Sequence, residues 1–214
     1  MWVKICGWNN QRVLEAALVA GTPDAIGLNF YPPSVRYVSI ETAQAMRECV
    51  PAGVAVVGVF VNSSRGQILQ TVKQVGLTHV QLHGDETPEF VASLGSVPVI
   101  RVYRPKVADI GPIAADLETL RHWGATPWAC LVDAYHAGEY GGTGAVAPWA
   151  MLTNWPTDWP PLILAGGLTP TNVTSAIQQV KPFGVDAASG CERIKGEKDP
   201  ALVRAFIEAV RTRR

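Results

Sequence analysis

The strongest constraint on the fold is a regular alternation of strand-like and helix-like segments along the whole chain of 214 residues. Continuous apolar runs such as Val54–Val61 suit strands that are covered on both faces, and each is followed by residues with the apolar spacing of a helix. This alternation occurs eight times with short connections. It predicts an α/β fold, a closed parallel (β/α)8 TIM barrel formed as a single domain by residues 1–214, with its chemistry at the carboxyl ends of the strands.

Caps and turn residues set the expected boundaries of these segments. The expected strands cover residues 2–7, 25–31, 54–61, 79–83, 97–103, 128–134 and 162–165, and an eighth strand begins at residue 184. The expected helices cover residues 11–20, 108–122 and 147–155, and others begin near Ser39, Asn62–Ser64, Thr87, Thr169 and Asp199. A short polar turn is expected between the eighth strand and the last helix.

Two neighbouring strand ends are rich in small residues. In Pro161–Val173 a short apolar strand meets Gly166-Gly167, and Thr169 and Pro170 are residue types typical of a helix cap and a first helical position. Paired glycines let a ligand approach the backbone amides, and a helix N-terminus attracts anions. An ordinary strand-to-helix turn explains this segment equally well. Because the next strand ends in Ser189-Gly190, however, the pair resembles the phosphate site of a (β/α)8 barrel.

The composition argues against several classes of protein. The 18 Lys+Arg balance the 18 Asp+Glu, so no basic surplus indicates nucleic-acid binding. No apolar run is long enough for a membrane span, and the N-terminus lacks the layout of a signal peptide. The four cysteines, at positions 6, 49, 130 and 191, have neither metal-ligand spacing nor the density of a disulfide framework. We therefore expect a soluble, cytoplasmic protein with no metal, nucleic-acid or membrane partner.

In such a barrel, the residues at the strand ends form one ring around a pocket. The expected members are Cys6, Arg36, Asn62, His83, Arg101, Asp133, Gly166-Gly167 and Ser189-Gly190. Cys6 is the most informative, because Lys4 lies on the same face of its strand and a nearby cation would let the thiol act as a base near neutral pH. A buried structural cysteine is the plain alternative, and we assign that role to Cys49 and Cys130.

Three polar members of the ring suit particular tasks. Asp133 follows a buried run and opens a glycine-rich segment, so it could be a general acid beneath a loop that closes over substrate, or it could simply cap that loop. Arg36 could pair bidentately with a substrate carboxylate, or it could remain a solvated charge. A lone histidine before a glycine, as at His83, more often satisfies a local hydrogen bond than catalyses a reaction.

Segments along nearly the whole chain resemble the phosphoribosylanthranilate isomerases, ribulose-phosphate-binding (β/α)8 barrels of tryptophan biosynthesis. The matching segments are VKICG, DAIGLNFYPPSVRYVS, VGVFVN, VQLHGDE, LVDAY with GGTG, LILAGGLTPTNV, and GVDAASGCE through GEKDP. Each alone is modest support, but their shared order and spacing make the resemblance highly specific.

The resemblance implies a cofactor-free aldose–ketose isomerisation, the Amadori rearrangement of N-(5'-phosphoribosyl)anthranilate to 1-(2-carboxyphenylamino)-1-deoxyribulose 5-phosphate. It implies that Asp133 protonates the ribose ring oxygen and that Cys6 then takes the C2' proton. Arg36 would hold the anthranilate carboxylate, and His83 and Asp186 would lie near the substrate, although Asp186 could instead make a structural hydrogen bond. The phosphate would be held by the backbone around Gly142, Gly166, Gly167, Ser189 and Gly190.

The chain departs from the family pattern in three places. Val35 replaces the proline of the usual Ser-Pro-Arg, and Trp8-Asn9-Asn10 follow Gly7 where an Ile-Thr or Ile-Arg type is common. Ala188 replaces a serine before Ser189, which removes a hydroxyl that could contact phosphate. None of these changes removes the expected acid, base or glycine pairs.

Two other functions fit part of the pattern. The related isomerase of histidine biosynthesis resembles a pair of aspartates where this chain has Cys6 and Asp133, and it usually shows half-barrel repeats that are not found here. A non-catalytic phosphate-binding barrel would not need both of these residues. We expect a small phosphorylated substrate and a monomer, with a homodimer as the alternative, because no apolar dimer seam is legible.

Overall fold

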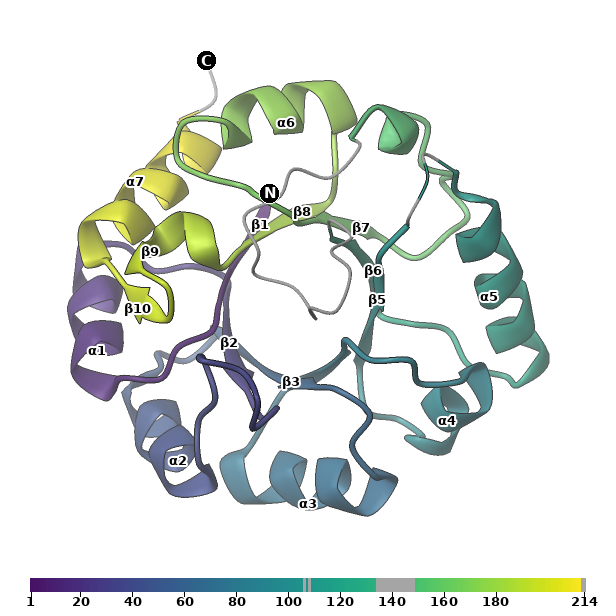
Figure 1. The fold of residues 1–214 in the computed structure, drawn as a ribbon, viewed down its shortest axis with the longest axis horizontal. Helices are drawn as coiled ribbons and strands as arrows, with labels where there is room; N and C mark the ends of the chain where they lie inside the picture. Colours follow the sequence, from purple (N-terminus) through teal and green to yellow (C-terminus); the bar gives the residue numbers. More distant parts are fainter. Residues whose placement is uncertain (106, 108, 134–148, 213–214) are drawn as a thin grey trace.

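The computed structural model of the chain describes residues 1–105, 107, 109–133 and 149–212. Eight parallel strands close into a barrel in chain order, which confirms the predicted fold (Figure 1). The strands are β1 (Trp2–Cys6), β2 (Ala25–Asn29), β3 (Ala55–Phe60), β4 (His79–Leu82), β5 (Val99–Tyr103), β6 (Ala129–Val132), β7 (Leu162–Leu164) and β8 (Gly184–Ala187).

The α-helices lie outside the barrel (Figure 1). They are α1 (Gln11–Ala20), α2 (Ile40–Cys49), α3 (Arg65–Val75), α4 (Pro88–Ser93), α5 (Gly111–His122), α6 (Val173–Val180) and α7 (Pro200–Arg211). The predicted caps Ser39, Thr87 and Asp199 each accept a hydrogen bond from a backbone amide in the first turn of their helix. No helix within the described part of the chain is long and apolar enough to span a membrane.

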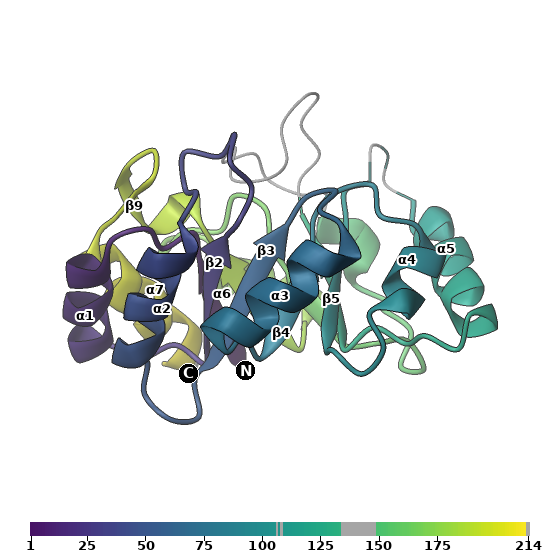
Figure 2. The same ribbon diagram turned by 90° about the horizontal axis from the view of Figure 1, so that it is seen from below.

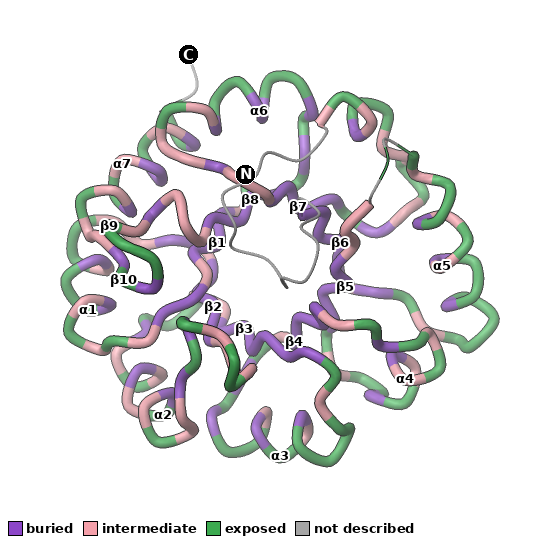
Figure 3. Tube along the Cα trace, viewed as in Figure 1, coloured by how far each residue is buried: buried purple, intermediate pink, exposed green. Residues whose placement is uncertain are grey.

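Alternate side chains of the strands build two cores. Outward side chains pack against the helices, and a smaller cluster fills the barrel: Ala25, Val57, Ile100, Val102, Ala129, Leu131, Ile163 and Ala165. Trp2 and Trp128 pack against this inner cluster, with ring centroids 5.4 Å apart. Because both faces of the strands are covered (Figure 3), a strand such as β3 needs apolar residues at every position.

The start of α6 differs from the prediction. The helix begins at Val173, with Asn172 at its cap, rather than directly after Thr169. The side chain of Asn172 accepts a hydrogen bond from the Thr169 amide and donates one to the Gly167 carbonyl, at 2.8 and 2.9 Å. These bonds close a turn before the helix. The predicted cap at Thr169 is therefore wrong, because this turn delays the start of the helix to Val173, and the side chain of Asn172 makes no cap hydrogen bond to the helix itself.

The predicted helix over residues 147–155 is also wrong for its described part, which forms a 3-10 turn, η1 (Trp149–Leu152). Thr153 Oγ1 donates to the Ala150 carbonyl at 3.0 Å. Pro156 lies a few residues further on and lacks the amide hydrogen that a continuing helix needs.

A small hairpin follows β8 where only a polar turn was expected. The 3-10 turn η2 (Ser189–Cys191) leads into the antiparallel strands β9 (Glu192–Ile194) and β10 (Glu197–Lys198). Figure 2 shows that β9 lies at the same end of the barrel as the loop between β2 and α2, opposite the N-terminus. This is the end at which the parallel strands finish, so the hairpin and the loop form part of the barrel mouth.

Candidate active site at the barrel mouth

A buried ion pair joins β1 to β8 inside the barrel. The register sets Lys4 opposite Asp186, and Lys4 Nζ donates to Asp186 Oδ2 at 2.9 Å. The other oxygen, Asp186 Oδ1, is buried and accepts no hydrogen bond from the described residues. Cys6 lies on the same face of β1 as Lys4, one inward position nearer the mouth. The structure therefore brings Cys6, Lys4 and Asp186 into one group.

The ion pair governs the electrostatics of this group. Burial lowers the pKa of Lys4, but Asp186 and Cys6 outweigh it, so that pKa lies above its ordinary value. Burial raises the pKa of the Cys6 thiol by more than Lys4 lowers it, and Asp186 raises it further. Lys4 does lower the pKa of Cys6, in the predicted direction, but burial outweighs it, so the expectation that the pKa of the thiol is brought down toward neutral is wrong. Burial also raises the pKa of Asp186 more than Lys4 lowers it.

Gly27 of β2 makes room for the Cys6 thiol. The register pairs the two residues, and a Cβ atom on Gly27 would lie 2.6 Å from Cys6 Sγ. Any larger residue would displace the thiol. The sequence analysis did not single out Gly27, although a glycine inside a strand is itself a sign of close approach.

His83 and Asp133 face each other across the mouth. They follow β4 and β6, and His83 Nε2 lies 3.5 Å from Asp133 Oδ2. Gln81 Nε2 lies 3.3 Å from His83 Nδ1, and if it donates there the histidine proton sits on Nε2, toward Asp133. After burial and Lys4, the charges of Asp133 and His83 also act on the pKa of Asp186, Asp133 raising it and His83 lowering it, so these three predicted site residues lie near one another.

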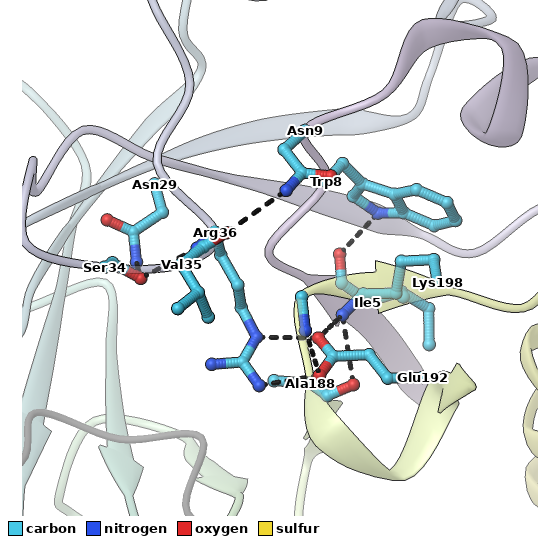
Figure 4. Close-up of polar contacts among 11 residues, drawn as sticks. Ile5, Trp8, Asn9, Asn29, Ser34, Val35, Arg36, Ala188, Glu192 and Lys198 are labelled. Atoms are coloured by element: carbon cyan, nitrogen blue, oxygen red, sulfur yellow. Dashed lines mark hydrogen bonds and ion pairs between the residues drawn. The ribbon is translucent and has the colours of Figure 1, made fainter. Parts of the chain in front are cut away.

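Arg36, from the loop after β2, is held by a carboxylate that the sequence analysis missed. Its Nε and Nη2 donate to Glu192 Oε1 and Oε2 at 2.6 and 2.7 Å (Figure 4). The Arg36 stem crosses Gly7, where a Cβ atom would lie 2.4 Å from Arg36 Cδ. Gly7 has a φ of +88°, which also favours glycine. Glu192 belongs to the segment GVDAASGCE, but only the fold brings it to Arg36.

Two predicted members of the ring lie elsewhere. Arg101 Nε lies 3.2 Å from Asp116 Oδ2 of α5, on the helix side of the sheet. Its neighbours Ile100 and Val102 fill the barrel, so the alternation of the strand turns Arg101 outward. The side chain of Asn62 accepts a hydrogen bond from the Asp85 amide at 2.8 Å, so it holds the loop after β4.

The two glycine-containing turns after β7 and β8 lie against each other. A Cβ atom on Gly190 would lie 1.9 Å from the Leu168 carbonyl oxygen, so only glycine allows this approach. Gly166 and Gly167 have φ values of +86° and +64°. The turn that holds Gly190 therefore packs directly on the backbone of Leu168, the residue that follows Gly166-Gly167. Gly142, the remaining residue of the predicted phosphate site, lies outside the described residues.

The remaining cysteines lie away from this pocket. Cys130 and Cys191 are buried, and burial raises the pKa of each thiol to about 12. Cys49, at the end of α2, donates to Glu15 Oε1 at 3.0 Å, and that hydrogen bond raises the pKa of the thiol. Cys130 is therefore a buried cysteine, as predicted, whereas Cys49 is only partly buried, so its predicted role as a buried structural cysteine is wrong.

Known proteins match the chain along nearly its full length. Residues 3–209 match the model of the N-(5'phosphoribosyl)anthranilate (PRA) isomerase family. The chain is 44% identical over 208 residues to the N-(5'-phosphoribosyl)anthranilate isomerase of Acinetobacter calcoaceticus, covering 97% of this chain and 95% of that protein.

Solved structures agree with the sequence matches. The phosphoribosyl anthranilate isomerase of Thermotoga maritima superposes with a TM-score of 0.84 at 33% identity, covering 98% of each chain. A second crystal structure, of the isomerase in complex with reduced 1-(o-carboxyphenylamino)-1-deoxyribulose 5-phosphate, gives a TM-score of 0.80 at 33% identity and covers 98% of this chain and 97% of that one. The chain therefore belongs to the N-(5'-phosphoribosyl)anthranilate isomerase family.

Proposed function

We propose that this chain catalyses the Amadori rearrangement of N-(5'-phosphoribosyl)anthranilate to 1-(2-carboxyphenylamino)-1-deoxyribulose 5-phosphate, a step of tryptophan biosynthesis. The observation that carries the proposal is the meeting of Cys6, Asp186, His83 and Asp133 at the mouth of a barrel of this family. A thiol and several carboxyl groups in one pocket can supply both proton transfers of an isomerisation.

In the proposed mechanism, Asp133 gives its proton to the ribose ring oxygen while the bond from that oxygen to C1' breaks, leaving a protonated Schiff base. The thiolate of Cys6 then takes the proton from C2', and the electron pair of that C–H bond neutralises the nitrogen to give an enolamine. Tautomerisation to the ketone returns a proton to C1'. The sugar is oxidised at C2' and reduced at C1', so no external oxidant or reductant is needed.

The raised pKa of Cys6 makes the reaction pH-dependent. Because the base must be a thiolate, kcat/KM should increase as the pH rises toward the pKa of the thiol. Once formed, a thiolate of raised pKa is a stronger base toward C2'.

Binding of the substrate would use the rest of the mouth. The adjoining turns at Gly166-Gly167 and Ser189-Gly190 would present backbone amides to the phosphate. Arg36 would receive the anthranilate carboxylate, because a guanidinium offers paired donors that match its two oxygens.

Turnover of freshly generated phosphoribosylanthranilate, followed by the loss of its fluorescence, tests this function. Cys6→Ser and Asp133→Asn should each lower kcat by about 10²–10⁴-fold. Cys49→Ser is the matched control and should leave kcat unchanged. Full kcat in Asp133→Asn would contradict the assigned acid. If the wild-type protein binds the reduced product analogue but does not turn over substrate, the chain is instead a phosphate-binding barrel.

We also propose that the protein acts in the cytoplasm as a monomer on a small phosphorylated substrate. The burial of Trp8 in the core supports the monomer, because this large apolar ring is not available to a partner subunit. Light scattering coupled to gel filtration should give the mass of one chain, and a mass of two chains would show the homodimer.

A further inference from the structure

The contact between Arg36 and Glu192 joins two elements that are far apart in the sequence. Arg36 lies in the loop after β2, and Glu192 begins the β9–β10 hairpin. Both side chains are almost fully buried, with 7% and 2% of their surface exposed. Both carboxylate oxygens are engaged, one by Nε and the other by Nη2, so the guanidinium plane is fixed as well as its position.

Glu192 is itself held from the other side. Lys198 Nζ donates to Glu192 Oε1 at 2.5 Å and to the Ala188 carbonyl at 3.1 Å, and the Gly196 amide donates to Glu192 Oε2 at 3.0 Å (Figure 4). Burial raises the pKa of Glu192, but Arg36, Lys198 and Gly196 outweigh it and hold that pKa at about 2. The carboxylate is therefore ionised and immobile at any physiological pH.

The loop that carries Arg36 meets the same structure. Asn9 Nδ2 donates to the Val35 carbonyl at 3.3 Å, and a Cβ atom on Gly196 would lie 3.1 Å from that oxygen. The loop after β2 is thus packed between the loop after β1 and the hairpin. Arg36 is fixed both at its backbone and at its charged end.

Because Glu192 binds one edge of the Arg36 guanidinium, it sets the direction in which the other edge points. A guanidinium has two paired edges, one formed by Nε and one Nη atom and one formed by the two Nη atoms. Glu192 takes the first edge, which orients the second. Among the described residues two cations, Arg36 and Lys198, share one anion, so this group of side chains carries a net positive charge that attracts a further carboxylate.

We infer that Glu192 is a positioning residue, which holds Arg36 so that its second edge receives the carboxylate of the substrate. This inference rests on the proposed function, in which Arg36 binds the anthranilate carboxylate. Glu192 does not touch substrate in this scheme. It lowers the cost of binding by fixing a long side chain before the substrate arrives.

Two ligands separate this role from a purely structural one. They are reduced 1-(o-carboxyphenylamino)-1-deoxyribulose 5-phosphate and the same compound without the ring carboxyl group, with Kd measured by calorimetry. Glu192→Gln keeps the shape of the side chain but faces Arg36 with an amide. This variant should raise the Kd of the ligand that carries the carboxyl group by roughly tenfold or more and leave the Kd of the other ligand nearly unchanged. Glu197→Gln, in the same hairpin but 55% exposed and paired with Arg193, is the control and should change neither Kd.

Several outcomes would overturn the inference. An equal rise in the Kd of both ligands in Glu192→Gln would show a structural role alone. Tighter binding of the ligand that carries the carboxyl group would show that Glu192 competes with substrate for Arg36. If the wild-type protein turns over substrate but binds both ligands equally, the proposed reaction stands and the positioning role fails. If Glu192→Gln does not fold, Glu192→Asp must show the same selective loss in smaller form, and an unselective loss there counts against the inference.

Discussion

Two buried ion pairs at the barrel mouth use their carboxylates in opposite ways. Glu192 accepts hydrogen bonds from Arg36, Lys198 and Gly196, and these contacts hold its pKa at about 2. Asp186 is bonded to Lys4 through one oxygen, its other oxygen is buried and has no partner among the residues that the structure describes, and burial raises its pKa. A carboxylate whose two oxygens both accept hydrogen bonds, such as Glu192, stays charged and fixes the cations around it. A carboxylate with an oxygen that accepts none from the described residues, such as Asp186, remains available to a ligand or a proton.

The largest expected effect comes from breaking the inner pair. Lys4→Met should lower the free energy of unfolding by about 3–5 kcal/mol at pH 8, because it leaves the Asp186 carboxylate buried without its cation. Urea denaturation measures the change. Lys4→Met/Asp186→Asn should recover much of the loss, since it buries no charge. A loss below about 1 kcal/mol in the single variant would mean that Asp186 is neutral in the wild-type protein.

The two carboxylates should also differ in their pH dependence. The folded-state pKa of Glu192 lies below its ordinary 4.5, so its stabilisation is present above that pH and is lost as the pH falls toward 2. Glu192→Gln should therefore cost about 2 kcal/mol at pH 6, after allowance for screening at the rim, and less with falling pH. The pKa of Asp186 is raised, so the contribution of Asp186 to stability falls as the pH rises above 3.8, and Asp186→Asn should remove that contribution. If the free energy of unfolding of Glu192→Gln and of Asp186→Asn, each relative to the wild-type protein, changed with pH in the same direction, the contrast would be contradicted.

Two glycines test the same contrast through catalysis. Gly27→Ala places a methyl group against Cys6 Sγ, so it should lower kcat by about tenfold, an effect of about 1.4 kcal/mol. Gly7→Ala places one against the Arg36 stem at positive φ, so it should mainly raise KM. Steady-state kinetics of both variants would show whether kcat and KM separate in this way. The same change in both variants would indicate general distortion of the mouth.

The smallest effect on catalysis is expected for Arg101→Lys. Arg101 faces Asp116 and α5 rather than the pocket, so kcat/KM should stay within about twofold, while loss of the paired contact to Asp116 should lower the free energy of unfolding by about 1–3 kcal/mol. A large loss of kcat/KM without a loss of stability would show that Arg101 does contribute to the active site.

Local signals predicted the framework well. The helix over Gln11–Ala20 has the predicted bounds, and the cap at Asp199 is confirmed. The signals failed where a side chain competes for a backbone group, as Asn172 does at the start of α6. They also failed for Arg101, because whether a residue near a strand end points inward depends on a register that the sequence does not show.

The sequence by itself determined the alternating elements, the barrel and the types of residue at the strand ends, because these follow from periodicity, capping and motif order. The partners of the charged groups were decided by the tertiary structure. Lys4 meets Asp186 from the far end of the chain, and Arg36 meets Glu192 across 156 residues. Closure of the barrel creates these contacts, and burial then sets whether each group stays charged.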